Sequence, residues 1–300
     1  MTSTFNQHIP VGVRFMLLSA LGFALMTACV KLVSTHGIPV FEIVAARAFV
    51  SLVISYLDVK RKRLSVWGNN RKLLLLRGVI GTCALMCVYY AVTTLPLAEA
   101  TILQYFHPVF TALLAVLFLK ERIQFSSVVC IVLCMLGLYT IVQPTINVNT
   151  PAELPLFSVM IALFGAMASS VAYVIVKKLS KTEDSSVIIF YFPLVALPTS
   201  VLLIGDSFVM PDLYLTGLLI LVGLFTQVGQ LGLTKAMQTQ DASKASAYSY
   251  VQIIFSVVLG IMLFQEYPAF ETYIGGGLIV AGALINMFGA KWSGKKARTA

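Results

Sequence analysis

The feature that most constrains the fold is a run of about 20 apolar residues that recurs along the chain, with only short polar connections between the runs. At about 1.5 Å rise per residue, a helix of this length crosses the hydrocarbon core of a bilayer. The runs lie at 11–33, 39–57, 73–94, 97–119, 125–143, 157–176, 186–204, 213–234, 243–264 and 272–290. The sequence therefore predicts an all-α membrane protein with ten transmembrane helices.

The composition excludes a soluble globular protein. Of the 300 residues, 59% are hydrophobic and only 11% are charged. The connections between the runs are short, so they leave no room for a separate soluble domain. The first run is too long for a cleaved signal sequence, and no small-residue cleavage pattern follows it.

The net charge of +9 comes from basic residues that gather on one side of the predicted membrane topology. With the N-terminus in the cytoplasm, every Lys and Arg except Lys31 and Arg47 lies on the cytoplasmic side, Arg77 included. This positive-inside pattern predicts that both termini are cytoplasmic, in a cell membrane that we take to be the bacterial inner membrane. It also favours membrane lipid over nucleic acid as the partner of the basic residues.

An internal repeat relates the two halves of the chain. Residues 91–121 align with 236–266, which places Glu121 on Glu266 and Gln104 on Ser249. The predicted repeats are 1–145 and 146–300. Because each repeat holds an odd number of spans, the second is expected to be inverted in the membrane, with the substrate held between the two.

The fourth run carries a stripe of polar side chains, formed by Thr101, Gln104, His107 and Thr111. Helical spacing places them on one side of the span, so they should face protein or a watery cavity rather than lipid. Pro108 cannot donate a backbone hydrogen bond, which predicts that the carbonyl of Gln104 is left without a partner. His107 could also be a hydrogen-bonded filler, since it is a lone histidine.

Arg47 is the full charge predicted to lie well inside a span, and it needs a carbonyl, a carboxylate or a ligand anion. It fits two interpretations, a structural clamp on a neighbouring helix or an anion contact. The residues that we expect to bind substrate, by hydrogen bonds and stacking, are Gln104, His107, Tyr105, Tyr89, Tyr90, Arg47, Tyr173, Gln227, Gln230, Ser249 and Gln252. The alternative is that these polar residues only join helices.

Catalytic motifs are missing from the sequence. There is no P-loop, no paired set of Cys and His ligands, and no set of nucleophile, base and orienting residue. We therefore expect no enzyme activity, no cofactor and no bound metal.

Three stretches resemble the drug/metabolite transporter superfamily in its EamA-type branch. They are AARAFV around Arg47, the run at 76–123, and GGGLIVAGALI at 275–285. The resemblance implies two inverted five-helix repeats around a central cavity, with a possible homodimer.

The resemblance also implies a secondary transporter that moves a small organic metabolite by alternating access. The candidate substrates are a riboflavin-type or other planar aromatic metabolite, a nucleoside-like compound, an amino acid and a metallophore. The alternatives from other classes are a multi-span membrane enzyme and a lipid-handling or scaffold protein.

Overall fold

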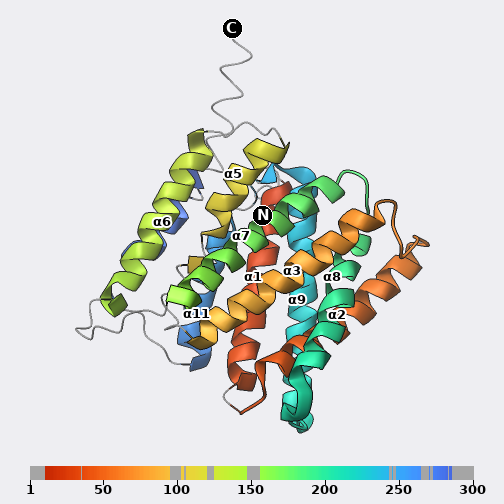
Figure 1. Cartoon of the computed structure of the whole chain (residues 1–300). Coiled ribbons are helices and arrows are strands. Elements are labelled where there is room, and N and C mark those ends of the chain that lie inside the picture. The colour runs from red at the N-terminus through yellow and green to blue at the C-terminus, as the bar shows by residue number, and fades with distance from the viewer. Residues whose placement is uncertain are drawn as a thin grey trace, which may run out of the picture.

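The structure is a computed structural model, and it describes residues 11–34, 36–94, 103–104, 106–119, 125–146, 156–242, 245, 248–264, 270, 273–282 and 284–285. Within these ranges the regular structure is helical, and no strand is present. Figure 1 shows the helices as a bundle, with α6 at one edge of the view and α2 and α8 toward the opposite edge.

In the described part of the chain, seven helices have 20 or more residues: α1 (Val11–Ser34), α2 (Val40–Arg61), α3 (Arg71–Thr94), α6 (Phe125–Ile146), α7 (Leu156–Leu179), α8 (Ser185–Ile204) and α9 (Leu213–Thr239). The shorter elements are α5 (His107–Leu119), α11 (Val251–Phe264), the helical segment Tyr273–Gly282, and the 3-10 turns η2 (Gly205–Ser207) and η3 (Tyr248–Tyr250). A helix thus occupies part or all of every predicted run. Among the helices of the described residues, five are long and apolar enough to cross a membrane: α1, α2, α7, α8 and α9.

Local chemistry fixes where several helices begin. The side chain of Asp184 accepts the backbone N–H of Ser186 at 2.8 Å and caps α8. Asp212 caps α9 in the same way through Leu215, at 2.7 Å. Carboxylates are favourable at these positions because the first N–H groups of a helix have no partner within it.

The described part of the fourth run differs from the expected continuous span. Helix α5 begins at His107, and Phe106 forms a turn before it. Pro108 is the second residue of α5, where its missing N–H breaks no intrahelical hydrogen bond. Residues 95–102 and Tyr105 lie outside the described residues.

Helices α1 and α9 pack backbone against backbone. A Cβ atom on Gly22 would lie 2.8 Å from the backbone nitrogen of Gly229, so neither helix could come this close with larger side chains. The hydroxyl of Ser19 donates to the carbonyl of Gly229 at 2.7 Å and adds a hydrogen bond between the two helices. Helix α1 also packs on α11, while α7 packs on α3 and α5.

Helices α2 and α8 lie against each other; α2 packs mainly on α9 besides, and α8 packs on α3 and also contacts α9. At the other edge of the bundle, the glycine-rich last run packs on α6, because Gly137 faces the carbonyl of Gly275 and Gly282 faces that of Cys130. The interior between these edges contains buried polar groups as well as apolar ones, and these define the candidate site.

Candidate functional site

His107, the first residue of α5, is 8% exposed and is held by hydrogen bonds on several sides. Its Nδ1 donates to the carbonyl of Gln104 at 3.1 Å, which makes Nε2 the acceptor of the neutral ring. The hydroxyl of Ser249 lies 3.4 Å from Nε2 and can donate to it. The His107 carbonyl accepts from the hydroxyls of Ser170 and Thr111, each at 2.8 Å. The prediction that the Gln104 carbonyl has no partner is therefore wrong, because the histidine ring reaches back to it.

Tyr173 on α7 extends this arrangement toward α3 and α9. Its ring meets that of His107 edge to face, with centroids 5.3 Å apart. Tyr173 also lies close enough to Arg77 on α3 for a charge on one group to affect the other. The Nη2 of Arg77 donates to Oε1 of Gln230 at 3.2 Å. We call these five residues, His107, Ser249, Tyr173, Arg77 and Gln230, the central polar cluster.

An aromatic ring supports the guanidinium group of Arg77. The ring of Phe192 on α8 has its centroid 4.7 Å from Cζ of Arg77 and 5.7 Å from Cζ of Arg47. Both arginines are buried, with 5% and 4% of their surface exposed. Two positive groups from α3 and α2 therefore face one ring, next to the central polar cluster.

The other predicted binding residues take different positions. Gln227 donates to the hydroxyl of Ser55 at 2.8 Å and joins α9 to α2. Gln252 is half-buried in the first turn of α11. Tyr90 is 40% exposed and packs edge to face on Phe157, with centroids 6.1 Å apart, so it lies away from the buried arginines. Tyr105 and the side chain of Tyr89 lie outside what the structure describes.

Arg77 and Phe192 are the residues that sequence reasoning missed. Arg77 was assigned to the cytoplasmic basic group, but it lies six residues inside α3, about 9 Å from the start of the helix. One signal was available, because position 77 falls inside the predicted run 73–94 and a buried arginine needs a partner. Nothing in the sequence distinguishes Phe192 from the many other apolar residues of its run.

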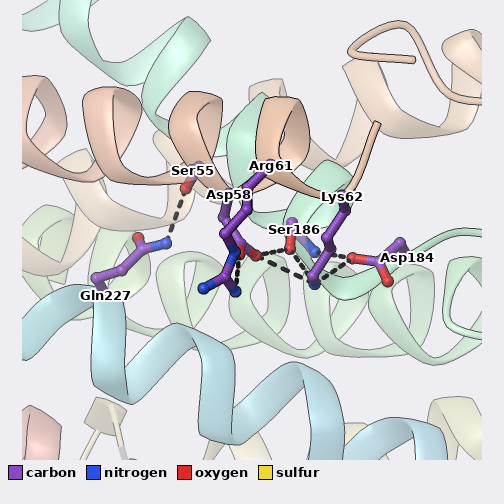
Figure 2. Close-up of polar contacts among 7 residues, drawn as sticks. All are labelled: Ser55, Asp58, Arg61, Lys62, Asp184, Ser186 and Gln227. Carbon is purple, nitrogen blue, oxygen red and sulfur yellow. Dashed lines mark hydrogen bonds and ion pairs between the residues drawn. The ribbon is translucent and has the colours of Figure 1, made fainter. Parts of the chain in front are cut away.

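A second polar group lies where α2 ends and α8 begins (Figure 2). The ammonium of Lys62 is 3.1 Å from the Asp58 carboxylate, 3.0 Å from that of Asp184, and 2.7 Å from the hydroxyl of Ser186. The Ser186 hydroxyl in turn donates to Asp58, which also pairs with Arg61 at 2.7 Å. We call Asp58, Lys62, Asp184 and Ser186 the α2–α8 ion cluster.

The charges of the α2–α8 ion cluster stabilise one another. Partial burial alone would raise the pKa of Asp184, but hydrogen bonds from the Ser186 backbone and from Lys62 hold that pKa below its usual range. Burial would likewise lower the pKa of Lys62, and its hydrogen bonds to Asp184 and Asp58 raise it instead. The opposite net shifts indicate that the pair is most favourable when both groups are charged.

Glu183 joins two connections on the face of the bundle that carries the α2–α8 ion cluster. Its carboxylate, 7% exposed, accepts the backbone N–H groups of Asn69 and Asn70 at 2.8 and 2.7 Å. The α2–α3 connection is thereby fixed to the α7–α8 connection, so this face is closed by polar contacts between the two halves of the chain.

The chemistry of the central polar cluster suits binding. It provides a hydroxyl, an amide, an imidazole, a phenol and positive charge. Within the described residues, no group of three His, Cys, Asp or Glu side chains has the arrangement of a metal site.

Comparison with known proteins places this arrangement in context. The family model described as the EamA-like transporter family matches residues 10–143 and again 156–288. The chain is 32% identical to the pseudopaline exporter CntI of Pseudomonas aeruginosa, over 91% of this chain and 94% of that protein. It is 30% identical to human solute carrier family 35 member G1, over 94% of this chain and 80% of the relative.

A more distant relative is the S-adenosylmethionine uptake transporter of Rickettsia bellii, at 24% identity over 94% of each chain. These relatives are named as transporters, not as enzymes. A crystal structure matches the fold with a TM-score of 0.78 at 17% identity, over 91% of this chain and 97% of its own.

Proposed function

Because the chain belongs to the EamA-like transporter family, we propose that it is a secondary transporter that moves a small organic metabolite by alternating access. The observation that carries the proposal is the central polar cluster. It draws Arg77 and His107 from the first half of the chain, and Tyr173, Gln230 and Ser249 from the second. Buried polar groups at the junction of two repeats are where such transporters hold their substrates.

The helix packing supports a two-fold relation between the repeats, and the odd number of predicted spans in each makes the relation an inverted one. If α1, α2, α3 and α5 correspond to α7, α8, α9 and α11, the contact of α1 with α9 corresponds to that of α7 with α3. The contact of α2 with α9 corresponds to that of α8 with α3, and the α1–α11 contact to the α7–α5 contact. The α2–α8 contact maps onto itself, so it would lie on the axis that relates the repeats. Repeats 1–145 and 146–300 would then rock against each other around this contact.

We place the face that carries the α2–α8 ion cluster in the cytoplasm, since it holds the basic loop 60–63. The closed polar contacts on this face fit a conformation that opens toward the outside. The substrate candidates are those that the resemblance implies: a planar aromatic metabolite, a nucleoside-like compound, an amino acid or a metallophore. The relatives named for pseudopaline and S-adenosylmethionine support a small organic solute.

The experiment that tests the proposal is solute counterflow in liposomes that contain the purified protein. Vesicles loaded with one candidate solute are diluted into a trace of the same labelled solute, and transient accumulation is expected for the transported one. Vesicles without protein are the control. Failure of every solute, together with transbilayer movement of a labelled lipid, would replace the transporter by a lipid-handling protein.

Alternating access has its own test at Ser249, which is 6% exposed. In a variant without the five native cysteines, Ser249→Cys should react with a small membrane-impermeant reagent applied on either side of the membrane. Transported solute should slow the reaction from both sides. Reaction from one side alone, with or without the solute, would contradict alternating access at this position.

A further inference from the structure

Arg77 presents a buried positive charge that the described residues satisfy only in part. Its Nη2 donates to Gln230, but Nε and Nη1 have no hydrogen-bond partner among the side chains and backbone groups that the structure describes. A guanidinium group carries five N–H donors and stays charged in proteins. Burying such donors without acceptors is unfavourable, so this site is incomplete without a further group.

None of the described carboxylates supplies that group. Glu42 accepts from the backbone of Val209, Glu183 binds the α2–α3 connection, and Asp212 caps α9. The described acids that form ion pairs, Asp58 and Asp184, belong to the α2–α8 ion cluster. The negative charge that would balance Arg77 therefore has no source among these residues.

The neighbourhood of Arg77 contains a second positive group and further buried polar atoms. Arg47 faces the same Phe192 ring, so this part of the interior holds two positive groups that would both attract an anion. One helical turn from Arg47, the buried hydroxyl of Ser51 lacks a partner among the described groups. The same holds for the hydroxyl of Thr226, one turn from Gln230. Both α2 and α9 thus present unsatisfied polar groups close to the charged ones.

The backbone makes room for the guanidinium group. A Cβ atom on Gly81, one turn after Arg77 on α3, would overlap Nη1 of Arg77 and lie 3.0 Å from the Phe192 ring. The group can occupy its present position only because residue 81 has no side chain.

We propose that Arg77, assisted by Arg47, binds the oxyanion of an anionic organic substrate, a carboxylate or a phosphate. The planar guanidinium fork matches two oxygens of either group, and the low-dielectric surroundings strengthen the contact. This inference rests on the proposed transporter function and names the substrate class of that same site. A neutral planar ring would leave the charge of Arg77 unbalanced.

The test measures thermal stabilisation of the purified full-length protein by pairs of ligands that differ in charge. Glutamate is compared with glutamine, succinate with succinamide, and adenosine monophosphate with adenosine. Sodium phosphate and sodium sulfate report on inorganic anions. A ligand that binds only the folded state raises Tm in a saturable way. The anionic member of at least one pair should stabilise the protein and its neutral partner should not; the first two pairs report a carboxylate and the third a phosphate.

The variants Arg77→Gln and Arg71→Gln connect that effect to the site. Arg71 is a matched control, because it lies on the same helix and also stacks on an aromatic ring, with Cζ 5.8 Å from the Trp67 centroid, but it is exposed. Arg77→Gln should weaken anion binding about 10- to 100-fold, as expected for the loss of charge-assisted hydrogen bonds. Arg71→Gln should leave the binding unchanged.

A second pair of variants leaves Arg77 and its charge in place, so the test does not depend on whether Arg77→Gln folds. Gly81→Ala pushes a methyl group against the guanidinium, while Gly217→Ala on α9 meets nothing within 4 Å. Gly81→Ala should weaken anion binding several-fold, and Gly217→Ala should not. If Arg77→Gln does not fold, this pair decides the question.

Anion binding that is equal in wild type, Arg77→Gln and Gly81→Ala would overturn the proposal. So would the absence of a saturable anion effect on the wild type, or a response to inorganic anions alone. Counterflow of a neutral solute that persists in Arg77→Gln would contradict the proposed anion site but would still support the proposed transporter function. If no solute of either charge moves, the proposed transporter function itself fails.

Discussion

The central polar cluster and the α2–α8 ion cluster both join the two halves of the chain, but they satisfy their charges differently. In the ion cluster every charge has an opposite partner, and the side chains of Lys62 and Asp184 are 32% and 36% exposed. In the central polar cluster Arg77 is 5% exposed and makes one hydrogen bond to the residues that the structure describes. Charges that are paired with each other at the surface are suited to holding two helices together. A buried charge without a counter-ion is suited to binding a ligand.

The magnitudes support this difference. Exposed ion pairs contribute about 0–1 kcal/mol each, because water screens them and long side chains lose entropy. A buried donor without a partner is unfavourable by about 1–3 kcal/mol. The protein therefore gains modestly from the first region and gives up stability at the second, a pattern common at functional sites.

The largest effect on transport is expected from a substitution of Arg77, which tests whether its charge serves ligand binding or stability. Arg77→Met should reduce transport at least about tenfold, because a buried contact to the ligand is lost. Because Arg77 has no counter-ion among the described residues, removing its buried charge should leave Tm unchanged or raise it. Counterflow and thermal unfolding in the absence of ligand measure the two effects. Arg71→Met is the control and should retain transport, and a large fall in the Tm of Arg77→Met would instead indicate a structural role.

A smaller effect is expected at His107. His107→Ala should reduce transport about three- to tenfold, because it removes the hydrogen bond to Gln104 and the contacts with Ser249 and Tyr173. Ser249→Ala should have a weaker effect. The double variant should be no worse than His107→Ala, since the serine acts through the imidazole. Transport losses that simply multiply would show that the two residues act independently.

At the α2–α8 ion cluster we expect changes in stability of about 1 kcal/mol or less per interaction. Asp184→Asn keeps the cap of α8 and removes the charge, so it should destabilise by a few tenths of a kcal/mol, since screening reduces the contribution of the exposed pair. Asp184→Ala removes the cap as well and should destabilise by roughly 1 kcal/mol more. Thermal unfolding of the two variants separates capping from charge. Equal losses would mean that the cap contributes nothing.

The smallest effect is the pH dependence of this same pair. Because the pKa of Asp184 is lowered in the folded state, its contribution is present above the unfolded value of about 3.9 and is lost as the pH falls through the folded value. The raised pKa of Lys62 gives a contribution that is present below about 10.4 and is lost as the pH rises through the folded value. The difference in Tm between wild type and Asp184→Asn should therefore be flat from pH 5 to 9. A slope within that range would contradict this assignment, and high salt should reduce the difference.

The resemblance of AARAFV, 76–123 and 275–285 was sufficient to identify the family, and the family match over 10–143 and 156–288 confirms it. Residue roles were less accessible. The stripe on the fourth run pointed to His107, which the structure places beside Ser249, on the run that the repeat had paired with it. That these residues bind substrate stays a prediction.

The sequence by itself determined which segments of the chain form helices, because a bilayer admits long apolar segments only as structures that satisfy their own backbone. Tertiary structure decided the rest. It turned Arg77 from a presumed surface charge into a buried one, and it left Tyr90 exposed. It also brought Lys62 to Asp184 across 122 residues of chain. Such contacts depend on how whole helices tilt and pack, which the local pattern of apolar residues does not encode.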